Sequence, residues 1–168
     1  MKKPSAFLDR DGVINYDVGY LYKYEDLKLR PGVIDGLKYL QKKKFRIFIV
    51  TNQSGIARGF FSEKDLMALH QKLKKNLNRH KIRIDEIKYS PFHPNGKIKK
   101  YKKKSETRKP GNKMIKEIFK KWPTDIKRSF MIGDKISDRL CAKKSGLYFE
   151  FAKKNFFTQI KNILKKNS

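Results

Sequence analysis

The chain has 168 residues, of which 38% are hydrophobic, and this suffices for one domain with a single core. No apolar run approaches the roughly 20 residues of a membrane-spanning helix, and the run at residues 6–8 is too short for a secretory signal. The single cysteine, Cys141, excludes an internal disulfide and makes no zinc pattern by itself. We therefore expect a cytoplasmic protein with one domain over residues 1–168 and no membrane partner.

The formal net charge is +27, with 34 lysines and 9 arginines. Such a field attracts anions, including phosphorylated sugars and nucleic acid. Nucleic-acid-binding proteins favour arginine forks and aromatic stacking platforms, which are not conspicuous here, so we expect no nucleic-acid partner. Two interpretations of the lysines stay open: a solvated surface combined with an A/T-rich coding bias, or a functional basic face.

The first elements alternate between strand and helix. The apolar run at 6–8 predicts a buried strand, and residues 13–30 are aromatic-rich and irregular. Pro31 then opens a helix that continues to about Lys43, since proline is favoured at a first helical position. Residues 47–50 form the clearest buried strand.

A second helix is expected from Ser62 to about His80, with its leucines on one face. Ser62 and Asp65 form an acidic variant of the capping box, in which glutamate or glutamine is usual. Residues 84–89 predict a third strand, and a proline- and lysine-rich segment follows at 90–110.

The remaining chain repeats the alternation, with helices expected at 112–121, 137–144 and 157–166 and strands at 129–132 and 147–151. Strands that alternate with helices predict a parallel sheet covered on both faces. We therefore expect an α/β fold, a Rossmann-like three-layer αβα sandwich with a mainly parallel sheet.

Polar side chains follow three predicted strands, at the edge where an open parallel sheet binds ligands. Asp9 and Asp11 follow the first strand, and an extended backbone would direct both carboxyls the same way. Thr51 and Asn52 follow the second strand, where a hydroxyl and helix N–H groups could bind phosphate. Asp134 follows a later strand and could share Mg²⁺ with Asp9. Each piece alone is also typical of an ordinary turn or N-cap, so their order and placement carry the interpretation.

These segments resemble the four motifs of haloacid dehalogenase phosphatases. The first and second motifs, at residues 7–15 and 51–59, are similar to those of the branch with D,D-heptose bisphosphate phosphatases and histidinol-phosphatases. Residues 108–110 (Arg-Lys-Pro) resemble the third motif, and residues 133–135 (Gly-Asp-Lys) with Asp138 resemble the fourth. The motifs occur in the family's order, with no insertion for a large cap domain. For Asp138, direct metal ligation and a supporting role stay open, and we favour support.

The resemblance implies an aspartyl-phosphate mechanism. Asp9 would attack phosphorus, and Asp11 would protonate the leaving group and then activate water. Mg²⁺ would be held by Asp9, the main-chain carbonyl of Asp11 and Asp134. Thr51 and Lys109 would bind the transferring phosphoryl oxygens. The family's substrate-contacting positions correspond to Asp17, Gly19, Tyr20, Asn52, Gln53, Ser54, Arg108 and Lys135.

Many heptose bisphosphate phosphatases carry a zinc loop between the second and third motifs, and this chain departs from it. The four ligand positions hold Ser90, Phe92, Ser105 and Thr107. Hydroxyls and a phenyl ring cannot replace thiolates and imidazole, so we predict no structural zinc and a more mobile loop. Six lysines lie between residues 97 and 104; they either bind a second anionic group of the substrate or are simply solvated.

The resemblance favours hydrolysis of a sugar bisphosphate, with D-glycero-D-manno-heptose 1,7-bisphosphate as the leading substrate. Its setting would be the synthesis of nucleotide-activated heptose for lipopolysaccharide. A histidinol-phosphatase or another small-molecule phosphatase is the alternative, followed by a nucleic-acid 3′-phosphatase and an inactive binding module. Intact candidate catalytic residues argue against the inactive module. We expect a monomer, because no predicted helix has an unexplained second apolar face.

Overall fold

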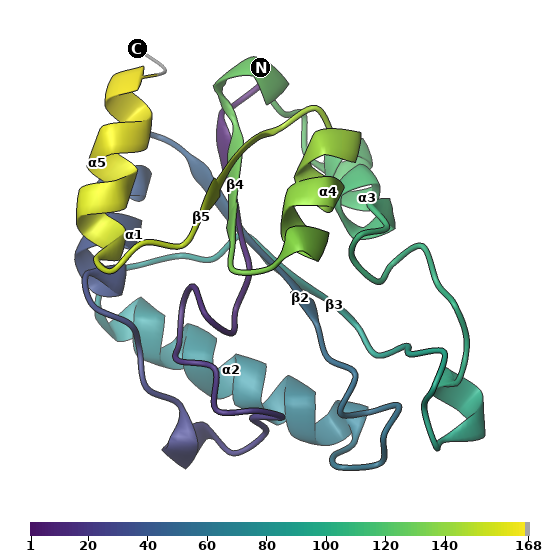
Figure 1. Cartoon of the computed structure of the whole chain (residues 1–168). Coiled ribbons are helices and arrows are strands. Elements are labelled where there is room, and N and C mark those ends of the chain that lie inside the picture. The colour runs from purple at the N-terminus through teal and green to yellow at the C-terminus, as the bar shows by residue number, and fades with distance from the viewer. Residues whose placement is uncertain (167–168) are drawn as a thin grey trace.

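The computed structural model describes residues 1–166, which are built around one five-stranded sheet (Figure 1). The strands are β1 (Ser5–Leu8), β2 (Arg46–Asn52), β3 (Glu86–Ser90), β4 (Phe130–Gly133) and β5 (Tyr148–Phe151). Their order is β3-β2-β1-β4-β5, and every neighbouring pair is parallel. The predicted parallel sheet is confirmed.

Within residues 1–166, five α-helices cover the sheet: α1 (Val33–Lys42), α2 (Glu63–Arg79), α3 (Lys113–Lys121), α4 (Ile136–Lys144) and α5 (Phe156–Lys166). Helices α1 and α5 lie side by side on one face, and α3 and α4 cover the other (Figure 1). Leucines of α2 join the core under α1 and α5. The predicted three-layer αβα sandwich is therefore confirmed. No helix among these residues has the length and apolarity needed to cross a membrane.

Successive side chains of β1 point to opposite faces of the sheet, so this short strand contributes to two hydrophobic cores. Ala6 and Leu8 lie in the core formed with α1, α2 and α5, whereas Phe7 lies in the core formed with α3 and α4. Phe7 also stacks on Phe48 of β2, with ring centroids 5.2 Å apart. Because both faces of the central strands are buried, they are continuous apolar runs in the sequence.

The first residues of α1 and α2 are determined by the residues immediately before each helix. Helix α1 begins at Val33 and not at Pro31, because Gly32 between them has a left-handed backbone (φ 78°) that a right-handed helix cannot include. The acidic capping box before α2 is confirmed. Ser62 Oγ accepts from Asp65 N at 3.1 Å, and the Asp65 carboxylate accepts from Ser62 N at 2.8 Å.

The strand order places a ligand crevice beside β1. The chain first adds β2 and β3 on one side of β1 and then crosses to β4 and β5 on the other. Ligands of open parallel sheets bind at the carboxyl ends of the strands where the order reverses in this way. Asp9 and Asp134 directly follow β1 and β4, and Asp9 N donates to Ile132 O at 3.0 Å. Both carboxylates therefore lie at this crevice.

Candidate active site

Lys109 is the centre of a buried charge cluster. Its side chain is 2% exposed, and Nζ lies 3.1 Å from Asp9 Oδ1 and 2.6 Å from Asp138 Oδ1. The same ammonium donates to Val50 O at 2.8 Å. Asp9 follows β1, Asp138 lies in the first turn of α4, and Lys109 comes from the loop before α3. One ammonium thus connects three separate segments at the carboxyl end of the sheet.

Burial and ion pairing act in opposite directions on the pKa values of this cluster. Burial raises the pKa of the Asp9 carboxyl to about 7, although attraction to Lys109 acts in the opposite direction. Burial alone would lower the pKa of the Lys109 ammonium, but Asp9 and Asp138 outweigh it and the net pKa lies above its usual value. Lys109 therefore remains a positive charge next to Asp9 throughout the physiological pH range.

Three carboxylates form a group with the spacing of a cation site. Ligand oxygens of Asp9, Asp134 and Asp138 lie within 4.8 Å of one another. Both oxygens of Asp138 are engaged, Oδ1 with Lys109 and Oδ2 with the main-chain N–H groups of Asp134 and Lys135. In contrast, Asp134 Oδ1 is buried and has no hydrogen-bond partner among residues 1–166. Asp9 and Asp134 therefore fit a hard cation such as Mg²⁺, and Asp138 fits a supporting role.

The carboxylate of Asp11 is held by three side chains, two from its own loop and one from the segment after β2. Arg10 donates to it from Nε at 3.1 Å and from Nη2 at 2.9 and 3.1 Å. Asn15 Nδ2 donates to Oδ1 at 2.9 Å, and Gln53 Nε2 donates to Oδ2 at 3.0 Å. Gln53 Nε2 also lies 2.9 Å from Thr51 Oγ1, which accepts from it. A single buried amide thus links Asp11 to Thr51.

Asn52 is bound to the main chain of Lys109. Its Oδ1 accepts from Lys109 N at 2.9 Å, and its Nδ2 donates to Lys109 O at 3.1 Å. These two bonds connect the end of β2 to the loop that carries the buried ammonium. The side-chain amide of Asn52 therefore positions Lys109, while the residue also lines the space in front of it.

A cavity of about 370 Å³ opens beside the charge cluster. It is lined by Asp11, Gly55 and Arg58 together with all eight residues expected to contact substrate, namely Asp17, Gly19, Tyr20, Asn52, Gln53, Ser54, Arg108 and Lys135. An adjoining space of about 110 Å³ reaches Asp9 and Lys109. The structure thus brings the expected substrate-contacting residues together with the charge cluster, whereas none of the lysines of residues 97–104 lines either space.

Two arginines on the wall of this cavity have unused hydrogen-bond donors. Arg58 Nε and Arg108 Nη1 are buried without a hydrogen-bond partner in the part of the chain that the structure describes. Burial, followed by the nearby charge of Arg58, lowers the pKa of the Arg108 guanidinium. Arg58 is held over the ring of Tyr20 at 5.9 Å and contacts His93 Nε2 at 3.4 Å. Buried guanidinium donors without partners suit an anionic ligand.

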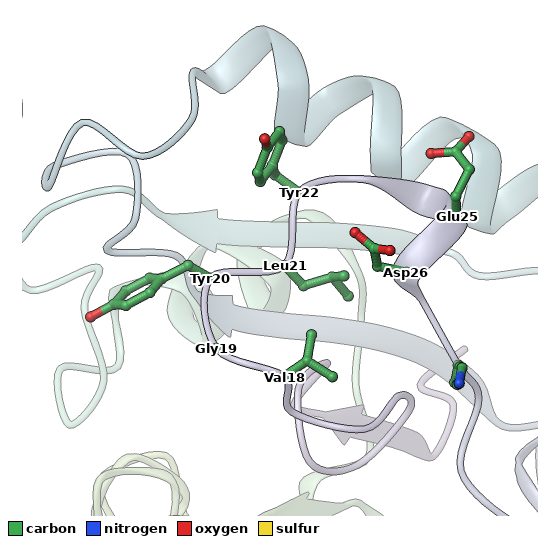
Figure 2. A pocket seen from close by; sticks show the side chains of 8 residues that line it. Val18, Gly19, Tyr20, Leu21, Tyr22, Glu25 and Asp26 are labelled. Atoms are coloured by element: carbon green, nitrogen blue, oxygen red, sulfur yellow. The ribbon is translucent and has the colours of Figure 1, made fainter.

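A second hollow lies on the other side of the loop that carries Tyr20. It measures about 480 Å³ and is formed by the segment 18–28 (Figure 2). The carboxylates of Glu25 and Asp26 belong to this hollow, and the Tyr20 ring points away from them (Figure 2). Because carboxylates repel phosphate, the cavity with Arg58 is the better anion site.

Three residues at or beside this site were not predicted from the sequence: Arg10, Arg58 and His70. Arg10 and Arg58 lie inside the first and second motifs, but nothing in the motifs indicates that Arg10 is fully buried or that Arg58 Nε is buried. His70 had a readable signal, because it stands four residues after Leu66 and three before Leu73, on the apolar face of α2. A polar residue on a buried face requires a partner, and here that partner is Arg10.

The fold and the charge cluster agree with a phosphatase of the haloacid dehalogenase type, and comparison with known proteins places the chain in this class. A model of the family described as polynucleotide kinase 3 phosphatase matches residues 19–164. The chain is 43% identical over 164 residues to D-glycero-beta-D-manno-heptose-1,7-bisphosphate 7-phosphatase of Rhodopseudomonas palustris, covering 97% of this chain and 91% of the relative. The chain therefore belongs to the family of D-glycero-D-manno-heptose-1,7-bisphosphate 7-phosphatases.

Other relatives and solved structures agree with this placement. The D-glycero-alpha-D-manno-heptose-1,7-bisphosphate 7-phosphatase of Photorhabdus laumondii is 41% identical over 142 residues, which cover 84% of this chain and 78% of the relative. The structure of a haloacid-dehalogenase-like (HAD-like) phosphatase from Mesorhizobium loti superposes with a TM-score of 0.88 at 26% identity, over 99% of this chain and 86% of that one. D,D-heptose 1,7-bisphosphate phosphatase from B. bronchiseptica, complexed with magnesium and phosphate, has the same fold (TM-score 0.82, 24% identity, 99% of both chains).

Proposed function

We propose that this chain removes the 7-phosphate of D-glycero-D-manno-heptose 1,7-bisphosphate through an aspartyl-phosphate on Asp9. The observation that carries the proposal is the buried contact of Asp9 with Lys109, next to the 370 Å³ cavity whose wall includes Arg58 and Arg108, each with a buried donor that has no partner among residues 1–166. The relatives that cover most of the chain act on this substrate by name, on both its alpha and beta forms. The setting would be cytoplasmic synthesis of activated heptose for lipopolysaccharide.

In the first step, a carboxylate oxygen of Asp9 forms a bond to the 7-phosphorus while the bond from phosphorus to the sugar oxygen breaks. Asp11 gives a proton to that sugar oxygen. In the second step, Asp11 takes a proton from water, whose oxygen attacks phosphorus and releases Asp9 and inorganic phosphate. Lys109 and the hydroxyl of Thr51 bind phosphoryl oxygens and stabilise the charge that they carry in both transition states.

The metal expected for this reaction is Mg²⁺. Asp9, Asp134 and the main-chain carbonyl of Asp11 would hold it. The buried Oδ1 of Asp134, which has no hydrogen-bond partner in the described part of the chain, supports this ligand set. When bound, the ion supplies positive charge that reduces repulsion between the Asp9 carboxylate and the phosphoryl group. Asp138 keeps Lys109 and the start of α4 in place beside it.

The second phosphate of the substrate has a suitable site at Arg58 and Arg108. Replacing Arg58 by glutamine should raise KM for the bisphosphate by about tenfold or more and change KM for a 7-monophosphate much less. The same comparison of KM for the bisphosphate and the monophosphate tests the six lysines between residues 97 and 104. If those lysines bind the second phosphate instead, serine at several positions between 97 and 104 produces this selective effect, whereas equal effects on both substrates exclude the loop.

The substrate is tested by phosphate release from both heptose bisphosphate anomers, histidinol phosphate and a 3′-phosphorylated oligonucleotide, with Mg²⁺. Turnover of a heptose anomer that disappears in Asp9→Asn supports the proposal. Preference for histidinol phosphate would replace it by the second candidate, and preference for the oligonucleotide would favour the activity in the matching family model's name. A folded protein that binds Mg²⁺ but hydrolyses none of them would favour an inactive binding module. Light scattering of the same preparation tests the expected monomer.

A further inference from the structure

Arg10 is fully buried, and its guanidinium forms hydrogen bonds in three directions. Nε and Nη2 donate to the Asp11 carboxylate, as described above, and Nη2 also lies 3.3 Å from Leu21 O. Its other terminal nitrogen, Nη1, lies 3.0 Å from Nε2 of His70 on α2. The orientation of the guanidinium is therefore set by Leu21 and His70 together.

His70 can act as the acceptor in this contact. It is 7% exposed, and burial followed by the charge of Arg10 lowers the pKa of its imidazole to about 3. The ring is therefore neutral at physiological pH, with its proton on Nδ1 and a lone pair on Nε2 that faces Arg10. The contact joins residues that are 60 positions apart in the chain.

We propose that His70 is a positioning residue for Asp11, acting through Arg10. This inference rests on the proposed role of Asp11 as the group that exchanges protons. Asp11 must present its carboxyl to the leaving oxygen in one orientation, and small displacements of a catalytic group slow a reaction strongly. Arg10 has a long side chain, and the acceptor on His70 keeps its fork aligned with Asp11. Without it, the Nη1 donor is buried unpaired and the guanidinium tilts toward another partner.

The chemistry of the leaving group separates this role from a general structural role. An alkyl phosphate, such as the sugar substrate, releases an alkoxide oxygen that needs the proton of Asp11. p-Nitrophenyl phosphate releases a stable phenolate that needs no proton. Since kcat/KM reports the steps up to the first irreversible one, misplacement of Asp11 lowers it for the alkyl substrate far more than for the aryl substrate.

The test compares His70→Gln with His70→Asn, measuring kcat/KM on the heptose bisphosphate and on p-nitrophenyl phosphate with Mg²⁺. The glutamine amide reaches the place of Nε2, whereas the asparagine amide is one methylene too short. We expect His70→Asn to lose about 10- to 100-fold on the alkyl substrate and less than about threefold on the aryl substrate, as partial loss of general acid catalysis predicts. His70→Gln should stay within about threefold of the wild type on both. His70→Met, of similar volume, replaces the asparagine variant if that variant does not fold.

Equal losses on both substrates, an equal defect in the glutamine variant, or no defect at all would overturn the inference. These outcomes leave the proposed function intact, because the wild type still turns over the sugar substrate. If the wild type hydrolyses another alkyl phosphate in place of the heptose bisphosphate, that compound serves as the alkyl substrate and only the proposed substrate fails. If it hydrolyses no phosphomonoester, the proposed function and the inference both fail.

Discussion

Gly12 and Asp134 lie so close together that a side chain on Gly12 would overlap the Asp134 carboxylate. A Cβ built on Gly12 meets Oδ2 and Cγ of Asp134, and the residue also has a left-handed backbone (φ 83°). The loop after β1 and the loop after β4 can approach only because this position has no side chain. The close approach brings Asp134 to the same crevice as Asp9.

Replacing Gly12 by alanine should therefore abolish Mg²⁺ binding. Gly146→Ala is the matched control, because Gly146 is also left-handed (φ 70°) but a Cβ there meets nothing closer than 3.7 Å. Both variants carry the backbone penalty of about 1–2 kcal/mol. The shift in Tm that Mg²⁺ produces should vanish in the Gly12 variant and persist in the control. A normal Mg²⁺ response of Gly12→Ala would contradict the assignment of Asp134 as a ligand.

Removal of the Lys109 ammonium should destabilise the fold and abolish activity. Lys109→Met leaves the buried carboxylates of Asp9 and Asp138 without their shared cation, and breaking a buried ion pair costs about 3–5 kcal/mol. Lys88→Met breaks the equally short but more exposed pair with Glu117 (2.6 Å), which should cost at most about 1 kcal/mol. Urea unfolding at neutral pH without Mg²⁺ measures both losses. Similar losses in the two variants would show that burial of the cluster is unimportant.

His70 should make the folded protein sensitive to acid. Its pKa of about 3 lies below the usual 6.5, so between these values the unfolded chain binds a proton that the folded chain does not. The stabilisation is complete above pH 6.5 and falls with pH by up to about 1.4 kcal/mol per unit. Asp9, with its raised pKa, acts in the opposite direction in the same window.

The two effects are separated by comparing the wild type with His70→Gln, because Asp9 is present in both. The difference in free energy of unfolding between the two proteins should shift against the wild type as the pH falls from 6.5 to 4.5. Urea unfolding at intervals of half a pH unit, without added Mg²⁺, gives this difference. A difference that is independent of pH would mean that His70 is protonated in the folded protein.

The protein should fold with no zinc bound to the loop between β3 and α3. Thr107 Oγ1 lies 2.8 Å from both Ser90 Oγ and Ser105 Oγ, so three of the four positions that correspond to the zinc ligands of the zinc-loop enzymes form a hydroxyl cluster. The purified protein should contain no stoichiometric zinc, and a strong chelator should leave its Tm unchanged in the absence of Mg²⁺. Thr107→Val should cost about 1–2 kcal/mol in urea unfolding, since it leaves two hydroxyls without this partner. One equivalent of zinc whose removal lowers Tm would refute the prediction.

The amino-acid sequence alone was sufficient to predict the parallel sheet and the edge at which Asp9, Thr51 and Asp134 lie. Apolar runs of strand length end in Asp9, Thr51 and Asp134, and alternation with helices makes the strands parallel. Parallel strands present their carboxyl ends at one edge, so local patterns determine that these side chains gather there. Sequence order alone does not say which strands are neighbours, and the position of β1 between β2 and β4 came from the structure.

Only the tertiary structure decided how the buried charges are paired. Lys109 meets Asp138 across 29 positions of the chain, and Arg10 meets His70 across 60. These contacts depend on where helices α2 and α4 pack against the sheet. They also depend on the direction of long polar side chains, which hydrophobic periodicity does not specify. The role proposed for Arg58 also depends on tertiary structure, because only the folded chain places its buried Nε at the wall of the cavity. Local sequence patterns thus indicate where the candidate catalytic side chains lie, whereas packing between distant segments determines which residues hold those side chains in place.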